Sequence, residues 1–314
     1  MMEIKGSIGK YKILKKLGSG GFGTVYLAED TFLKTQRALK IPHRLSAGKE
    51  KLLEESVVQT KLLDHPNIVK LLTVDIMDNT IIMVMEYVNG SDLEKTIDSQ
   101  DSLSVQTSLV YFKQILSALE YAHKNMVLHR DIRPSNILIN EDNIIKITDF
   151  GTSTILGERQ HATTKIGSPP YMAPEQFEGK AVFASDIYSA GCLFYEMVTG
   201  FPPIVLLNPM EIYKKAKVGD FLPLIKKKKS ITEELNAIIM KALAPDISDR
   251  YKNISSMLED INSLGNKSRD NTSEIKNIQK RIAARNERSD HVCWKCRKTM
   301  PQKSGKCIYC GADQ

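Results

Sequence analysis

The stretch from His129 to Asn136 reads H-R-D-I-R-P-S-N, and Asp149-Phe150-Gly151 follows it shortly. The carboxylate of Asp131 can accept a proton. The side-chain oxygens of Asn136 and Asp149 are ligands of the kind that Mg²⁺ prefers. This part of the chain therefore combines a base and a candidate metal site within a short span.

Two apolar runs separate these residues, Ile137-Leu138-Ile139 and Ile144 to Ile147. The polar turn between them, from Asn140 to Asn143, indicates a hairpin of two short strands. Such a hairpin would bring Asn136 and Asp149 side by side.

The pattern H-R-D-x-x-x-x-N followed by D-F-G resembles the catalytic core of the protein kinase family. By this resemblance Asp131 accepts or orients the proton of the acceptor hydroxyl, and Asn136 and Asp149 hold Mg²⁺ or Mn²⁺. Arg133 stands where the family usually has Lys. It keeps a positive charge near the γ-phosphate but is larger and forked. His129 is expected to have a structural role, stacked with Phe150.

Tyr11 to Asp30 is predicted to form a strand, a glycine turn and a second strand, with the motif G-x-G-x-x-G-x-V inside it. Glycines let the backbone approach phosphates closely. A dinucleotide site is the rival interpretation of this motif and requires a helix directly after it. The β-branched and aromatic continuation from Thr24 to Ala28 favours a strand, and hence a flap over the phosphates of ATP. The residues assigned to this flap are Leu17, Gly18, Ser19, Gly20, Gly21, Phe22, Gly23 and Val25.

The next strand ends at Pro42 and matches the A-x-K of the family, which makes Lys40 the candidate partner of the α- and β-phosphates. Ala47 to Asp64 has the 3.6-residue period of a helix. In the family, a Glu of this helix pairs with the Lys. At the usual distance before His65, however, this chain has Ser56. We assign the role to Glu55, with Glu54 behind it. The alternative is that both are solvated charges.

Leu71 to Val88 is predicted to form two strands, and its end resembles the hinge of the nucleotide pocket. By this match Met85 is the gatekeeper, and Glu86 to Val88 offer backbone groups to adenine. The apolar walls would be Leu17, Val25, Ala38 and Leu138. Asp92 matches a position that often meets the ribose or the substrate, although an ordinary helix N-cap explains it equally well.

Ser104 to Lys124 is predicted to be a long amphipathic helix, and helices dominate from there to about residue 264. The resemblance therefore implies an α+β, two-lobed kinase domain over residues 8–264. Its small β-rich N-lobe spans about 8–88 and its larger helical C-lobe about 89–264.

Gly167 to Glu175 resembles the end of the kinase activation segment. Ser168 and Arg133 point to Ser or Thr as the acceptor. Thr163 and Thr164 are candidate phosphorylation sites whose phosphate could meet Arg130, although a flexible Thr-rich loop is the alternative. Asp186 is expected to hold the catalytic-loop backbone, and Arg250 to pair with Glu175.

The chain has 314 residues, of which 42% are hydrophobic and 26% charged, which suits one large or two moderate domains. No apolar run approaches the roughly eighteen residues of a membrane span, and the N-terminus lacks an apolar signal segment. A cytoplasmic enzyme without a membrane partner is therefore expected.

The tail differs from the rest of the chain. Gly265 to Gln314 contains twelve basic and five acidic residues, an excess that equals the +7 of the whole chain. Residues 265–290 are predicted to be a polar linker with a short basic helix. Residues 291–314 contain two C-x-x-C pairs, Cys293 with Cys296 and Cys307 with Cys310. This spacing predicts a structural Zn²⁺ site that resembles a zinc ribbon, and disulfides are the alternative.

The role of the ribbon is left open between docking of a protein partner, nucleic-acid binding and a purely structural appendage. For the whole chain we expect a bacterial-type, eukaryotic-like Ser/Thr protein kinase that uses ATP and Mg²⁺ on protein substrates. The alternatives are a pseudokinase, and a scaffold or nucleic-acid-binding module with a vestigial kinase fold.

Overall fold

The chain contains two compact units, Met1–Ile261 and Asn262–Gln314. The computed structural model describes residues 6–19, 23–42, 56–62, 64–77, 80–150, 154–155 and 167–264. In the tail it describes residues 291–293, 295–296, 299–300, 305–307 and 309–313. The first unit contains the kinase-like motifs and the second the four tail cysteines.

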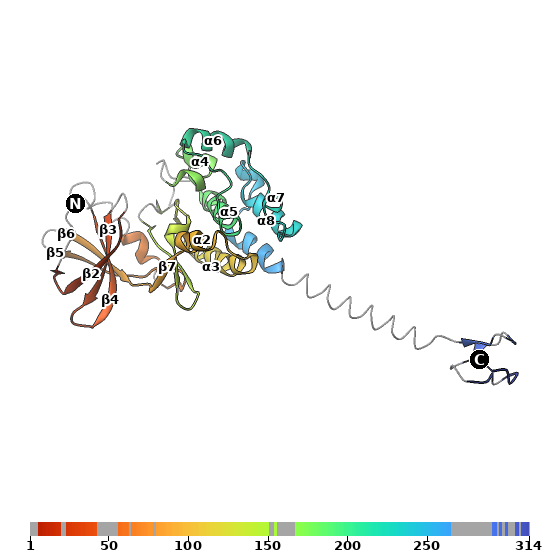
Figure 1. Ribbon diagram of the computed structural model, residues 1–314. Helices are drawn as coiled ribbons and strands as arrows, with labels where there is room; N and C mark the ends of the chain where they lie inside the picture. Colours follow the sequence, from red (N-terminus) through yellow and green to blue (C-terminus); the bar gives the residue numbers. More distant parts are fainter. Residues whose placement is uncertain are drawn as a thin grey trace. The chain divides into compact units, whose positions relative to one another are not determined.

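A six-stranded antiparallel sheet forms the N-lobe, with the strand order β1-β2-β3-β4-β6-β5 (Figure 1). Its strands are β1 (Ser7–Ile8), β2 (Tyr11–Ser19), β3 (Gly23–Asp30), β4 (Thr35–Pro42), β5 (Leu71–Met77) and β6 (Thr80–Glu86). Because β3 follows the glycines directly as a strand, the dinucleotide-site alternative is wrong.

The alternation of side chains in β4 gives the sheet two different faces. Leu39 packs with Tyr11 and Tyr26 in one apolar cluster, whereas Ala38 packs with Met85 in another. Successive residues of a strand point to opposite faces, so Lys40 shares its face with Ala38. The sheet thereby presents Lys40 beside the second cluster.

The helix predicted from Ala47 to Asp64 is described only in part. Residues 56–60 are helical, and turns follow at 61, 62 and 64. The N–H of Lys61 donates to the carbonyl of Val58, and that of Leu62 to Gln59, which tightens the chain into a turn. The predicted extension of the helix to Asp64 was therefore wrong.

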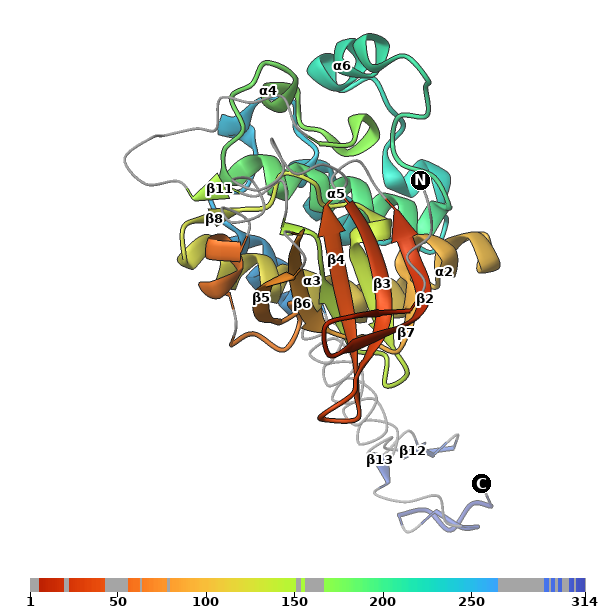
Figure 2. The ribbon, with the colours of Figure 1, turned by 90° about the vertical axis from the view of Figure 1, so that its left-hand side faces the viewer.

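The C-lobe is mainly helical; it lies to one side of the sheet in Figure 1 and behind the sheet in Figure 2. Its helices are α2 (Leu93–Gln100), α3 (Val105–Lys124), α4 (Pro174–Phe177), α5 (Phe183–Thr199), α6 (Pro209–Val218), α7 (Leu224–Lys227), α8 (Glu233–Ala242) and residues 254–264, with short 3₁₀ turns η1 (Pro134–Asn136), η3 (Pro169–Tyr171) and η4 (Ile247–Asp249). The prediction for α3 is confirmed, with Ser104 as its N-cap. Most of α5 is buried, which makes it the central helix of the lobe. The two-lobed α+β fold is confirmed.

Three short strands form a second sheet with the order β10-β9-β7. It contains β7 (Gly90–Asp92), β9 (Ile137–Asn140) and β10 (Ile145–Ile147), and the two-stranded pair β8 (Val127–Leu128) with β11 (Thr154–Ile155) lies nearby in the chain. The predicted hairpin is confirmed by the pairing of Ile137 with Ile147. Strand β7 was not predicted. A Cβ on Gly90 would lie 1.9 Å from the carbonyl oxygen of Ile139, so only glycine permits this close pairing.

The second unit contains the short antiparallel strands β12 (His291–Val292) and β13 (Thr299–Met300). The predicted linker and its basic helix, residues 265–290, lie outside the described residues. Among the residues that the structure describes, no helix combines the length and the apolar character needed to cross a bilayer.

Candidate active site

Asp131 is held between two hydrogen-bond donors. The hydroxyl of Ser168 donates to Asp131 Oδ1 at 2.8 Å, and Asn136 Nδ2 donates to Asp131 Oδ2 at 3.1 Å. Asn136 Nδ2 also bonds the main-chain carbonyl of Asp131 at 2.8 Å. These contacts fix the carboxylate, and because they use the side-chain nitrogen of Asn136, its side-chain oxygen is the atom that could bind a metal.

Asp186 of α5 supports the backbone of the same loop. This fully buried carboxylate accepts hydrogen bonds of 2.9 Å from the backbone N–H groups of His129 and Arg130, and from His123 Nε2. Burial alone would raise the pKa of Asp186, but these hydrogen bonds outweigh burial and lower the pKa. The carboxylate therefore stays ionised, and the expected scaffold role is confirmed.

His129 links the loop to the strand that precedes Asp149. Its Nε2 lies 3.2 Å from the carbonyl oxygen of Thr148, and its Nδ1 accepts from the N–H of Asp131 at 3.2 Å. Its ring meets Phe150 edge-on, with centroids 4.6 Å apart and planes at 69°. The structural role holds, but the expected stacked geometry is replaced by an edge contact because the ring nitrogens fix its plane.

Lys40 and Asp149 form a direct ion pair. Lys40 Nζ lies 2.8 Å from Asp149 Oδ1, and the Lys40 side chain is 8% exposed. Asp149 has a positive φ of 63°, a conformation that costs energy in a residue other than glycine. The site therefore contains a cation and a carboxylate that are suited to phosphate and metal. Glu54, Glu55 and Gly151 lie outside the described residues.

The predicted adenine walls gather on one side of the sheet. Val25, Val88 and Leu138 pack against the cluster that contains Ala38 and Met85. The strand register pairs Val25 with Lys40 and Ala38 with Met85, so these residues lie next to Lys40. Leu17 is 38% exposed.

The described ends of the glycine loop lie on β2 and β3. Gly18 pairs with Val25, Ser19 with Thr24, and Gly23 opens β3. The hydroxyls of Ser19 and Thr24 are 3.0 Å apart, which ties the two strands together. Gly20, Gly21 and Phe22 lie outside the described residues.

Glu86, at the predicted hinge, is anchored by a residue that the sequence did not single out. Its Oε1 accepts from Lys146 Nζ and from the N–H of Lys70, both at 2.8 Å. Lys146 lies between two buried isoleucines of β10 and carried no signal that linked it to Glu86. Asp92 caps α2 by accepting from the N–H of Lys95 at 2.8 Å, so the N-cap interpretation is confirmed.

The guanidinium group of Arg133 forms two contacts. Nη1 donates to Ser168 Oγ at 2.9 Å, and Nη2 donates to Glu94 Oε1 at 3.2 Å. Glu94 was also missed, because a Glu in the first turn of a helix is an ordinary feature of sequences.

The end of the activation segment is fixed by two polar contacts. Arg250 binds Glu175 with two hydrogen bonds of 2.7 and 2.9 Å, as expected. The hydroxyl of Tyr171 donates to Glu196 Oε2 at 2.6 Å. Burial raises the pKa of Glu196 to about 7. Thr163 and Thr164 lie outside the described residues.

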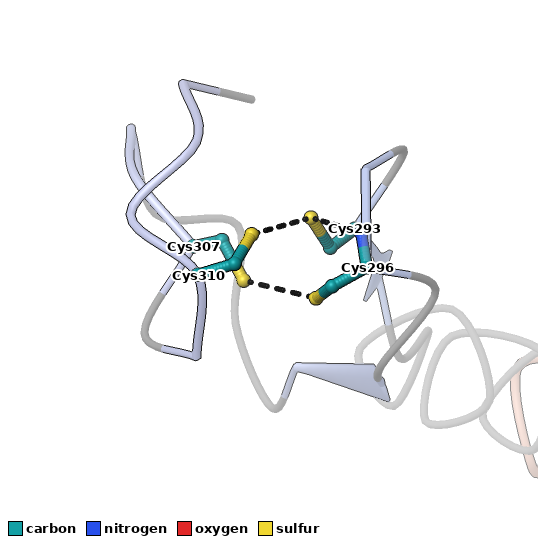
Figure 3. Close-up of side chains that lie close together, drawn as sticks. All are labelled: Cys293, Cys296, Cys307 and Cys310. Atoms are coloured by element: carbon teal, nitrogen blue, oxygen red, sulfur yellow. Dashed lines mark hydrogen bonds between the residues drawn. The ribbon is translucent and has the colours of Figure 1, made fainter.

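The four tail cysteines converge, as Figure 3 shows. All four Sγ atoms lie within 4.8 Å of one another, with Cys293 3.7 Å from Cys310 and Cys296 3.6 Å from Cys307. A tetrahedral zinc site separates its sulfurs by about 3.8 Å, whereas a disulfide requires about 2.05 Å. The N–H of Cys296 lowers the pKa of Cys293 to about 6, which favours a thiolate ligand. The donor set fits zinc.

Comparison with known proteins agrees with this geometry. Residues 11–261 match the family described as the protein kinase domain. The serine/threonine-protein kinase PrkC of Bacillus subtilis is 36% identical over 259 residues, 81% of this chain and 40% of PrkC. A probable serine/threonine-protein kinase of Clostridium acetobutylicum is 35% identical over 82% of this chain and 40% of its own length. The carbon catabolite-derepressing protein kinase of Saccharomyces cerevisiae is 39% identical over 61% of this chain and 31% of its own length.

This chain thus spans about 40% of the length of the bacterial relatives. The matched domain nevertheless covers most of the chain, and identity above 30% extends over about four fifths of it. The chain belongs to the protein kinase family.

Proposed function

We propose that this chain is a protein serine/threonine kinase that transfers the γ-phosphate of ATP to hydroxyl groups of protein substrates. The observation that carries the proposal is the 2.8 Å contact between Lys40 Nζ and Asp149 Oδ1, which joins residues 109 positions apart. It brings a phosphate-binding cation to a metal-binding carboxylate, close in the chain to the fixed base Asp131. Phosphoryl transfer depends mainly on such positioning and charge neutralisation.

Each site residue then has one task. Mg²⁺ bound to ATP would neutralise phosphate charge, and the oxygens of Asn136 and Asp149 would hold it. Lys40 would meet the α- and β-phosphates. Asp131 would take or orient the proton of the acceptor hydroxyl.

The nucleotide base would lie against the cluster around Ala38 and Met85. Val25 and Leu138 pack against this cluster, which supports their role as apolar walls. The anchoring of Glu86 by Lys146 supports a fixed hinge from Glu86 to Val88. Leu17 would form a further apolar wall, and the glycine loop from Gly18 to Gly23 would cover the phosphates.

Glu55 is our proposed partner for Lys40 in the nucleotide-bound enzyme. It precedes two buried helical residues, Val58 and Gln59, by three and four positions. Side chains at these spacings share one face of a helix. Glu54 precedes Val58 by four positions and Gln59 by five, so only Glu55 has a helical spacing to both residues.

Serine and threonine are the proposed acceptors. The bonds of Ser168 with Arg133 and with Asp131 support this choice, because they bring the two residues that pointed to Ser or Thr together beside the proposed base. The names of the bacterial relatives agree with it.

Phosphorylation of Thr163 or Thr164 is the proposed control of the activation segment. Burial lowers the pKa of Arg130, as expected for a poorly solvated cation, and a nearby phosphate would compensate its charge. Mass spectrometry of active protein that found both threonines unmodified would contradict this proposal.

For the tail we propose a structural Zn²⁺ site and a docking role toward a protein partner. Tyr309 and Lys306 are both exposed and offer an aromatic and a basic contact to a partner. A loss of substrate affinity on truncation at Gly265, with transfer to a generic peptide unchanged, would support docking. Salt-dependent binding of a single-stranded oligonucleotide would instead favour nucleic acid.

The test of the main proposal is transfer of labelled γ-phosphate from ATP and Mg²⁺ to the chain itself and to a generic Ser/Thr peptide. We expect transfer by the wild type and none by Asp131→Asn. ATP binding without any transfer would instead identify a pseudokinase.

A further inference from the structure

We infer that Glu94 is a positioning residue of the transfer site, which holds Arg133 where it directs the Ser168 hydroxyl onto Asp131. The inference rests on the proposed function. Glu94 belongs to α2, whereas Arg133 and Asp131 belong to the catalytic loop, so the contact joins two separate elements.

The contacts form a continuous line of polar atoms. Glu94 Oε1 accepts from Arg133 Nη2 at 3.2 Å, and Arg133 Nη1 donates to Ser168 Oγ at 2.9 Å. Ser168 Oγ then donates to Asp131 Oδ1 at 2.8 Å. The far oxygen of Asp131 is bound by Asn136. Glu94 is therefore two side chains away from the proposed base.

The hydroxyl of Ser168 has one proton, and Arg133 determines where that proton points. An arginine only donates, so the bond from Nη1 uses a lone pair of Ser168 Oγ. The proton of Ser168 is then left for Asp131, which can only accept when ionised. The position of the Arg133 guanidinium therefore sets the direction in which the Ser168 hydroxyl donates.

The guanidinium of Arg133 depends on Glu94 for that place. Its Nε is buried without a hydrogen-bond partner among the described residues, so the head group is held through Nη1 and Nη2. The side chain of Arg133 is 33% exposed and that of Glu94 44% exposed, so neither is locked by packing alone. Removing the Glu94 charge would release Nη2 of Arg133 from its contact with Glu94.

A second carboxylate would compete for the freed guanidinium. Glu196, bonded to Tyr171, is close enough to Arg133 for their charges to interact, and it also interacts with Glu94. Without Glu94 we expect Arg133 to turn toward Glu196 and away from Ser168. The Ser168 proton would then lose its fixed direction.

The competing explanation is that Glu94 stabilises only α2, as an acid in the first turn of a helix. The two explanations differ in their dependence on Arg133. If Glu94 only stabilises α2, its substitution should change kcat equally with and without Arg133. If Glu94 positions Arg133, its substitution should change kcat only when Arg133 is present.

The experiment measures steady-state transfer to a Ser peptide by the full chain, with Glu94→Gln, Glu94→Asp, Arg133→Ala and the double variant Glu94→Gln/Arg133→Ala. We expect Glu94→Gln to lower kcat about threefold and to leave KM for ATP unchanged. Loss of a partly exposed ion pair should lower a rate by no more than roughly fivefold, and the expected effect lies within this limit. Glu94→Asp keeps the charge and should restore part of kcat. In the Arg133→Ala background, Glu94→Gln should change kcat by less than about 1.5-fold.

Glu211→Gln, an exposed first-turn acid of α6, is the matched control and should leave kcat unchanged. Wild-type kcat in Glu94→Gln, or an equal loss in both Arg133 backgrounds, would overturn the inference. Either result would leave the proposed function intact, because that function fails only if the wild type itself transfers no phosphate.

Discussion

Lys40 Nζ lies 2.8 Å from Asp149 Oδ1, and these groups come from β4 of the sheet and from the segment after β10. The Lys40 side chain is almost fully buried, while that of Asp149 is 36% exposed. The pair therefore fixes the Lys40 ammonium group and leaves part of the Asp149 carboxylate open to solvent. This arrangement suits the metal-binding role that we propose for Asp149.

Lys40→Met should abolish most phosphotransfer. Methionine keeps most of the side-chain volume but removes the positive charge, and loss of one such electrostatic group typically costs about a hundredfold in kcat. Steady-state transfer to a Ser peptide measures the effect. Lys12→Met, an exposed lysine of β2, is the control and should retain wild-type activity. Comparable activity in both variants would show that Lys40 has no part in the reaction.

Arg250→Met should destabilise the kinase unit. The Arg250 side chain is 0% exposed, and its bond to Glu175 is bidentate, so the substitution leaves a buried carboxylate without its partner. Such a change costs about 3–5 kcal/mol of unfolding free energy. Urea denaturation measures it. Lys215→Met breaks the exposed pair with Asp220 and should cost less than about 1 kcal/mol. Equal losses in the two variants would contradict the structural role of the buried pair.

Local sequence patterns predicted the elements that carry the site, because their signals lie within one segment. The hairpin between Asn136 and Asp149 follows from two apolar runs and a turn, and α3 follows from its period and its Ser104 cap. The contacts of Asp186 and of Arg250 with Glu175 were anticipated from family resemblance. The strand β7 was missed, because its pairing depends on the absence of a side chain at Gly90.

Contacts between distant side chains could not be predicted in the same way. Glu94 and Arg133 are 39 positions apart, and Glu86 and Lys146 are 60 positions apart. Each is an ordinary surface-type residue in its own segment, and only the packing of the segments brings the charges together. The proposed roles of Glu55, Thr163 and Thr164 stay predictions.

Glu196 should make stability depend on pH near neutrality. Its pKa is raised from 4.5 to about 7 by burial, so the folded chain holds this proton more tightly than the unfolded chain. The stabilisation is complete below about pH 4.5 and is lost as the pH rises to about 7. Between pH 5.5 and 8 the loss amounts to about 2 kcal/mol.

Glu196→Gln tests this dependence, because the amide oxygen still accepts from Tyr171 but cannot titrate. Urea denaturation at the two pH values should show a smaller difference for Glu196→Gln than for the wild type, by about 2 kcal/mol. Glu211→Gln should behave like the wild type. An unchanged pH difference in Glu196→Gln would assign the dependence to other groups.

Zinc removal should unfold the tail while leaving the kinase unit folded, because the two are separate compact units. The tail is too small for a core of its own, so the metal supplies its folding energy. A chelator should release about one Zn²⁺ per chain and expose four reactive thiols, measured with a colorimetric thiol reagent. Cys192 is the internal control, because burial in α5 raises the pKa of its thiol and should keep it unreactive.

Cys293→Ser should lower the zinc content and leave the thermal transition of the kinase unit unchanged. Four reactive thiols before chelation would mean that the cluster binds no metal, and no reactive thiol after chelation would point to disulfides.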